Sequence, residues 1–155
     1  MTTAKALGCG VPVGAFLMTE KVGQHSLTAG DHGTTYGGNP LACAAVAKVL
    51  ELFEENNILE HVREVSAYLE EKLDSLAAKY DFITDRRGMG LMQGLVFDRP
   101  VAPVINAALE NGLILINAGI NIIRFVPPLV ITTQMWMKLI EILDSCLKTF
   151  QEQNA

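Results

Sequence analysis

The sequence predicts an α+β fold in which helices pack on one face of a mostly antiparallel sheet. Three observations favour this class: two amphipathic helical patterns between residues 39 and 79, several short apolar runs between 81 and 126, and another amphipathic pattern near the end of the chain. Helices grouped before and after a run of strands cover one side of a sheet. The 155 residues, 50% of them hydrophobic, are enough for one domain with a real core.

The first part of the chain, residues 1–38, is irregular and rich in glycine and threonine. It contains one short strand-like apolar run at 13–18, and its many glycines bury little surface by themselves. We therefore expect residues 1–38 to be the edge of a larger domain. Residues 39–155 are expected to form a connecting helix followed by the small α+β domain.

Two helices follow. The first is predicted from Pro40 to about Glu55, because Asn39 is a good N-cap and proline suits the first turn. Its expected buried stripe is Ala42, Ala45, Val46, Val49, Leu50 and Phe53. The second begins after Asn57, where Glu60 completes a start that resembles a capping box. Its expected apolar face is Ile58, Val62, Val65, Leu69, Leu73 and Leu76.

The pattern then changes from helical to strand-like. Strands are predicted at 81–85 and 90–97, divided by a solvated turn at Arg86-Arg87-Gly88. A short helix is predicted at 100–110, and Asn111-Gly112 ends it.

Two more strands are predicted at 113–116 and 121–126. Pro127-Pro128 stops the sheet, because proline cannot donate to a strand ladder. The last helix is capped by Thr132 or Thr133, and we expect it to fray at 151–155. Its inward side chains are Trp136, Leu139, Ile140, Leu143, Leu147 and Phe150.

Composition narrows the functional classes. A net charge of -5 and the lack of a basic patch argue against a nucleic-acid partner, and no apolar stretch is long enough to span a membrane. Cys9, Cys43 and Cys146 are odd in number and far apart, so we expect no disulfide framework and a reducing, cytoplasmic setting. We expect Cys43 and Cys146 to be small core residues, and the three histidines show no metal-binding spacing.

Lys5 is the only charged residue in the stretch 4–16, where glycines and a proline make the backbone rigid and closely approachable. An ammonium among apolar neighbours is poorly solvated, and this favours the neutral amine that attacks carbonyl carbon atoms. From the residues alone, a lysine at the edge of a turn is the alternative interpretation.

Two other places carry candidate binding residues. Thr34 and Thr35 are hydroxyls among glycines, which suits a phosphate group, although a threonine-rich loop that caps the next helix is the alternative. Arg124 lies in an otherwise apolar run, where a guanidinium needs a carboxylate partner. That carboxylate belongs either to a substrate or to a nearby acidic side chain of the chain itself.

Four strings carry a family resemblance: Ala-Lys-Ala-Leu-Gly-Cys-Gly-Val-Pro-Val-Gly-Ala-Phe at 4–16, Gly-Asp-His-Gly-Thr-Thr-Tyr-Gly-Gly-Asn-Pro at 30–40, Arg-Gly-Met-Gly-Leu-Met at 87–92 and Arg-Phe-Val-Pro-Pro-Leu at 124–129. Together they resemble the fold-type I, class III aminotransferases, which use pyridoxal phosphate (PLP), and among these the acetylornithine aminotransferases most. The resemblance implies that the chain combines a remnant of the PLP-binding large domain, with its lysine and phosphate-binding loops, and the C-terminal small domain.

The resemblance also implies roles for the candidate residues. Lys5 would be the catalytic lysine that holds PLP covalently and moves protons. Thr35, and less strongly Thr34, would bind the cofactor phosphate of the neighbouring subunit, which implies a homodimer. Arg124 would bind the carboxylate of the substrates 2-oxoglutarate and glutamate.

The implied activity is transfer of the terminal amino group of N-acetylornithine to 2-oxoglutarate, a step of arginine biosynthesis. Transaminases for ornithine, succinylornithine or 4-aminobutyrate are the alternatives within the class. The family's upstream phosphate loop, ring-stacking aromatic residue and ring-nitrogen acid have no counterpart here. We therefore expect an incomplete C-terminal piece that is inactive alone, and the second hypothesis is a non-catalytic small domain.

Overall fold

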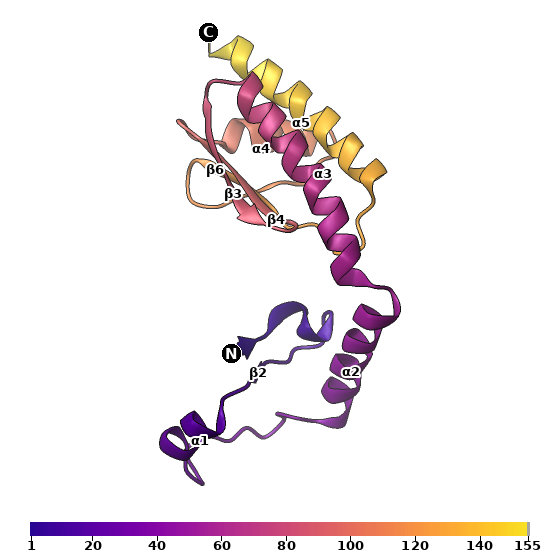
Figure 1. Ribbon diagram of the computed structural model, residues 1–155. Helices are drawn as coiled ribbons and strands as arrows, with labels where there is room; N and C mark the ends of the chain where they lie inside the picture. Colours follow the sequence, from indigo (N-terminus) through magenta and orange to yellow (C-terminus); the bar gives the residue numbers. More distant parts are fainter. Residues whose placement is uncertain (155) are drawn as a thin grey trace. The chain divides into compact units, whose positions relative to one another are not determined.

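The computed structural model describes residues 1–154 and confirms the α+β class, with helices and antiparallel strands (Figure 1). The chain divides into two compact units, Met1–Asn57 and the part that begins at Ile58. The helix at 40–55, which the sequence groups with the residues after it, belongs to the first of these units.

The first unit is built around a short strand pair. Strand β1 (Thr2–Thr3) pairs antiparallel with β2 (Ala15–Phe16), and the 3₁₀ turn η1 (Lys5–Gly8) lies between them. A short helix that the sequence did not indicate, α1 (Glu20–Ser26), follows. It is capped by the Thr19 hydroxyl and buries none of its residues. The sequence therefore has no apolar stripe that would predict this helix.

Helix α2 (Pro40–Glu55) ends the first unit and begins as predicted, because the Asn39 side chain accepts a hydrogen bond of 3.0 Å from the backbone N–H of Ala42. Its predicted stripe is only partly correct. Ala42 is buried, but Leu50 is 57% exposed and Cys43 is also exposed. Within this unit α2 packs mainly on the short turn η1, which covers little of the helix surface.

The second unit contains a four-stranded sheet and three helices. Helix α3 (Ile58–Lys79) precedes the hairpin of β3 (Ile83–Met89) and β4 (Met92–Phe97), and α4 (Ala102–Glu110) precedes β5 (Ile116–Asn117) and β6 (Ile122–Phe125). The final helix is α5 (Thr133–Gln153). The strand order is β3-β4-β6-β5, every pairing is antiparallel, and the helices lie on one side of the sheet (Figure 1).

The core of this unit lies between the sheet and the helices. The predicted apolar faces of α3 and α5 are confirmed, apart from Val62, Leu139 and Ile140, which are only partly buried. Cys146 is buried as expected. The largest fully buried side chains are Trp136, Tyr80, Phe97, Leu69, Leu73, Leu95, Ile123, Leu143 and Leu147.

The ends of the elements follow local signals in most places. Thr132 is the N-cap of α5, and β6 ends before Pro127-Pro128. Asn57 does not take the extended conformation of an N-cap, since its φ is 47°. Helix α5 continues to Gln153, so the expected fraying does not begin at 151, and Ala155 lies outside the described residues.

The predicted turn at Arg86-Arg87-Gly88 is wrong. Strand β3 runs through these residues to Met89, and Met89 pairs with Met92, so the hairpin turn is Gly90-Leu91. Gly90 has φ 57°, which suits the first central position of a two-residue hairpin loop. The turn therefore begins at Gly90, whereas the sequence predicted that it begins at Arg86.

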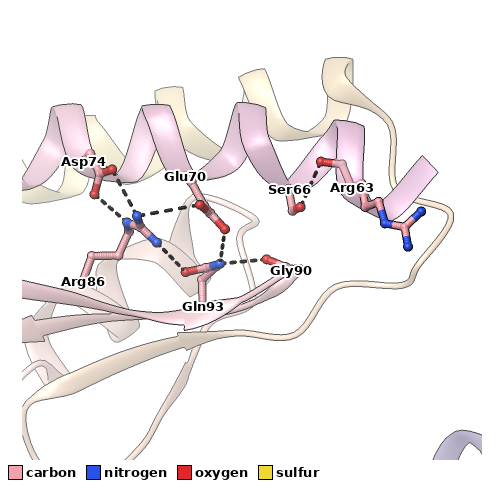
Figure 2. Close-up of polar contacts among 7 residues, drawn as sticks. All are labelled: Arg63, Ser66, Glu70, Asp74, Arg86, Gly90 and Gln93. Carbon is pink, nitrogen blue, oxygen red and sulfur yellow. Dashed lines mark hydrogen bonds and ion pairs between the residues drawn. The ribbon is translucent and has the colours of Figure 1, made fainter. Parts of the chain in front are cut away.

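Arg86 is part of a polar network rather than a solvated side chain (Figure 2). Its guanidinium binds both carboxylate oxygens of Asp74 on α3, lies 3.8 Å from Glu70 and donates a 3.0 Å hydrogen bond to Gln93. The Gln93 amide, 1% exposed, donates to Glu70 (3.1 Å) and to the carbonyl of Gly90 (2.8 Å). The network satisfies a buried amide and fastens the hairpin to α3.

A second polar cluster joins the end of α3 to α5. Asp144 accepts hydrogen bonds from the Lys79 ammonium at 2.7 Å and from the Tyr80 hydroxyl at 2.8 Å. Burial alone would raise the pKa of Asp144, but these two bonds outweigh burial and hold its pKa below the ordinary value. A lowered pKa in the folded state means that the ionised carboxylate stabilises the fold.

We expect this stabilisation to disappear in acid. It is present above the unfolded carboxyl pKa of about 3.9 and is lost as the pH falls through the lower folded value. The melting temperatures of the unaltered chain and of Asp144→Asn should therefore differ near neutral pH and converge towards pH 2. Asp81→Asn, at an exposed position, controls for the change in net charge. A difference for Asp144→Asn that stays constant across this range would contradict the assignment.

Candidate functional site

Lys5 lies at the start of η1 in a conformation that lysine rarely adopts. Its φ is 55°, in the left-handed region, and the preceding Ala4 is fully extended. Such backbone strain costs on the order of 1–3 kcal/mol and is concentrated at functional sites. The outlier therefore marks Lys5 as a candidate on grounds independent of the sequence motif.

The expected poor solvation of Lys5 is wrong for this chain, because Lys5 is exposed. In η1 only Gly8 is buried, and the two-residue strands β1 and β2 are too short to cover the lysine. Within residues 1–154, no carboxylate forms an ion pair with it. The amine is consequently open to a molecule from solution.

The glycine-rich loop carries Thr34 and Thr35, and both are exposed. The loop is ordered at its start by Asp31, which accepts hydrogen bonds from the backbone N–H (2.7 Å) and the hydroxyl (2.8 Å) of Thr28. These bonds hold the pKa of Asp31 below its ordinary value. At Gly37, a Cβ atom would lie 2.0 Å from the Thr34 methyl group, so the loop closes tightly over Thr34.

Arg124 lies on β6, between β4 and β5, and is exposed. Its register partners are Gly94 on one side and Ile116 on the other. In the part of the chain that the structure describes, no acidic side chain pairs with Arg124, so the alternative of an internal ion pair is not observed.

A hollow of about 310 Å³ adjoins Arg124. Its walls are predominantly apolar. Its lining residues include Ile114, Ile116, Val126, Pro127, Trp136 and Leu139. Arg124 thus lies beside an apolar hollow, and an exposed guanidinium suits a carboxylate partner.

Across residues 1–154, no group of three His, Cys, Asp or Glu side chains is placed to hold a metal ion. No helix within that range is long and apolar enough to cross a membrane. The three cysteines are free thiols.

The family profile Aminotransferase class-III matches residues 1–147. The chain therefore belongs to the class III aminotransferases, a PLP-dependent family of fold-type I.

Within the family, the chain is similar to proteins named acetylornithine aminotransferase. The relative from Clostridium acetobutylicum is 45% identical over 94% of this chain, and the one from Methanocaldococcus jannaschii is 41% identical over 93%. The chain spans 38% and 36% of these two relatives' lengths.

Solved structures agree. The acetylornithine aminotransferase of Elizabethkingia anophelis has a TM-score of 0.86 at 30% identity, covering 96% of this chain and 40% of that one. The ornithine δ-aminotransferase of Plasmodium falciparum has a TM-score of 0.90 at 30% identity, covering 97% and 39%.

The residues present fit two ends of PLP. Lys5 offers an accessible amine for its aldehyde, and the exposed hydroxyl of Thr35 lies in a glycine-rich loop that suits a phosphate. The sequence motifs single out Lys5, Thr34, Thr35 and Arg124 as candidates. They did not indicate that Arg86 belongs to a polar network or that Arg87 pairs with Gly94. Both features depend on how the strands pair.

Proposed function

We propose that the chain is part of a PLP-dependent transaminase that moves the terminal amino group of N-acetylornithine to 2-oxoglutarate. The observation that carries this proposal is Lys5, an exposed amine in a strained left-handed turn, within a chain that matches the family over residues 1–147. The choice of amino donor is supported by the relatives named acetylornithine aminotransferase at 41–45% identity. We propose that residues 1–38 are a remnant of the large domain. Residues 39–155 then form the connecting helix and the small domain.

Each candidate residue takes one role in this proposal. PLP, when bound, supplies the electron sink that stabilises negative charge at the substrate carbon. Lys5 would hold the aldehyde end of the cofactor, and its Nζ, once released, would move a proton from the substrate carbon to the cofactor carbon. Thr35 would donate to the phosphate of the cofactor held by the neighbouring subunit, with Thr34 a weaker candidate. Arg124 would bind a substrate carboxylate bidentately.

We further propose that the whole protein is a cytoplasmic homodimer. The first unit leaves large apolar side chains exposed, among them Tyr36 at 81%, Leu50 at 57% and Phe16 at 46%. Exposed apolar surface of this kind is typical of residues that pack against another protein surface. Three free thiols are compatible with a reducing compartment.

Two alternatives differ from this proposal in testable ways. The structural similarity to an ornithine aminotransferase makes ornithine the alternative amino donor, and succinylornithine and 4-aminobutyrate belong to the same chemical group. Because the chain spans 36–38% of two relatives' lengths, we also propose that turnover needs residues beyond these 155. Alone, the chain would then behave as a non-catalytic domain.

The test is covalent capture of PLP on the purified chain. After incubation with PLP and reduction with borohydride, peptide mapping should find a pyridoxyl group on Lys5 in preference to Lys21, an exposed lysine of the same unit. Modification that is equal at every exposed lysine would contradict a dedicated role for Lys5. In a protein of full family length, rates with N-acetylornithine and ornithine then decide the amino donor.

A further inference from the structure

The end of helix α4 carries the only Asn-Gly pair in the sequence, Asn111-Gly112, and both residues are exposed. An asparagine followed by glycine loses its side-chain amide in water more readily than one followed by any other residue, because glycine has no Cβ to hinder attack by its backbone nitrogen. The pair is therefore a candidate site of spontaneous chemical modification, and the local structure decides whether it reacts.

The reaction is deamidation, and it needs only water and a trace of base. The backbone nitrogen of Gly112 attacks the side-chain carbonyl carbon of Asn111 and loses its proton to the base. A new C–N bond closes a cyclic imide, the bond from that carbon to Nδ2 breaks, and ammonia leaves. Water then opens the imide at either of its carbonyl groups and leaves aspartate or isoaspartate at position 111.

In the folded chain the attacking nitrogen belongs to a Schellman motif, the hydrogen-bond pair that commonly ends a helix. The N–H of Gly112 donates to the carbonyl of Leu109 at 3.0 Å, and the N–H of Leu113 donates to the carbonyl of Ala108 at 2.8 Å. Gly112 has φ 80°, the left-handed conformation that the motif requires and that favours glycine. The glycine that makes Asn111 reactive is thus also the residue that ends the helix.

The amide group under attack is held as well. The Nδ2 of Asn111 donates to the carbonyl of Ala107 at 2.8 Å, and the backbone N–H of Asn111 donates to the carbonyls of Ala107 and Ala108. Ring closure needs the side-chain amide to leave Ala107 and the N–H of Gly112 to leave Leu109. The reaction therefore requires the last turn of α4 to open first.

Neither product can rebuild this helix end. A carboxylate at position 111 has no N–H to donate to Ala107, and a negative charge at the C-terminus of a helix opposes the helix dipole. Isoaspartate also inserts an extra carbon atom into the backbone before Gly112, which removes the spacing that the Schellman motif needs. A molecule that has reacted consequently cannot close α4 as before.

We propose that Asn111 is a deamidation site that the folded end of α4 keeps closed, and that deamidation after this end opens makes the loss of the helix end permanent. The inference concerns the second unit alone and is independent of the transaminase function proposed above.

The test compares the rate of deamidation in the folded and the unfolded chain. The 155-residue chain is kept in mildly alkaline buffer with and without urea, and mass spectrometry of its peptides follows aspartate and isoaspartate at position 111. A synthetic peptide of residues 107–116, too short to hold a helix, controls for the effect of urea on the chemistry.

We expect Asn111 to react at least about tenfold more slowly in the folded chain than in urea or in the peptide, because local opening must precede reaction. Equal rates in the folded and the unfolded chain overturn the protection by the fold. If the unfolded chain does not react at Asn111 either, the assignment of the site itself is overturned.

Leu113→Ala tests whether the helix end is the protecting element. Leu113 is partly buried against the core, and an apolar contact at its position accompanies a Schellman motif. The variant leaves the Asn-Gly pair intact, so its deamidation should become severalfold faster under conditions in which circular dichroism shows the chain to be folded. A folded variant that reacts no faster than the unaltered chain overturns the role assigned to the helix end.

Asn111→Asp imitates one product and tests its consequence. We expect it to lower the melting temperature of the second unit, followed by the fluorescence of the buried Trp136, by several degrees. Asn106→Asp is the matched control, because Asn106 is an exposed asparagine of the same helix and lies away from its last turn. Equal melting temperatures for the two variants overturn the claim that deamidation damages the helix end.

Discussion

Lys5→Ala is expected to abolish transamination in a protein of full family length while leaving the melting temperature of the 155-residue chain nearly unchanged. In the function proposed above, the amine both holds PLP covalently and carries the proton, and loss of a positioned acid-base group alone costs about 10²–10⁴-fold in rate. The fold should tolerate the change, because Lys5 is exposed and forms no ion pair within the described residues. Alanine at φ 55° carries a strain similar to that of lysine.

Two controls sharpen this test. Lys5→Arg keeps the positive charge but removes the nucleophilic amine, so it should be as inactive as Lys5→Ala. Lys21→Ala removes an exposed lysine from α1 in the same unit and should retain activity. A drop of several degrees in the melting temperature of Lys5→Ala would mean that the lysine supports the fold. Retained transamination in that variant would refute the catalytic role.

Gly88→Ala is expected to destabilise the second unit by about 3 kcal/mol or more, the combined order of backbone strain and overpacking. Gly88 has φ 141°, a conformation that is nearly exclusive to glycine. An added Cβ would lie 2.2 Å from the carbonyl oxygen of Met92 and 2.8 Å from the Cα of Gln93. Both contacts are with backbone atoms of the paired strand, so relief requires β3 and β4 to separate.

Denaturant unfolding measures this effect. Gly33→Ala is the matched control, because nothing lies within 4 Å of a Cβ at Gly33 and its φ is not in the left-handed region. A loss for Gly88→Ala no larger than that for Gly33→Ala would show that the hairpin accommodates a side chain. The same strand positions Arg86 and Arg87, so a distorted β3 should also disturb the polar network with α3.

Much of the fold could be predicted from local signals. The Asn39 cap, the helical spacing of α3 and α5, and the paired prolines after β6 depend on residues close together in sequence, and all of these predictions are confirmed. The failures concern tertiary surroundings. Leu50 and Cys43 fit a helical stripe but are exposed, because burial depends on what packs against the helix.

The candidate site shows the same limit. Motifs were enough to select Lys5, Thr35 and Arg124, since each lies in a distinctive string. The prediction of a solvated turn at Arg86 was wrong, because the partners of this side chain, Asp74 and Gln93, come from helix α3 and strand β4. The alignment of Arg87 with Arg124 follows only from the pairing of three strands, and no spacing along the chain encodes it.

The chain has one tryptophan, Trp136, and its side chain is fully buried in the second unit, near Phe125. Its indole Nε1 has no hydrogen-bond partner among the described residues. Intrinsic fluorescence excited at the red edge of the indole band, where tyrosine does not absorb, therefore reports on the second unit alone. Unfolding followed in this way, compared with circular dichroism of the whole chain, separates the melting of the two units without any label.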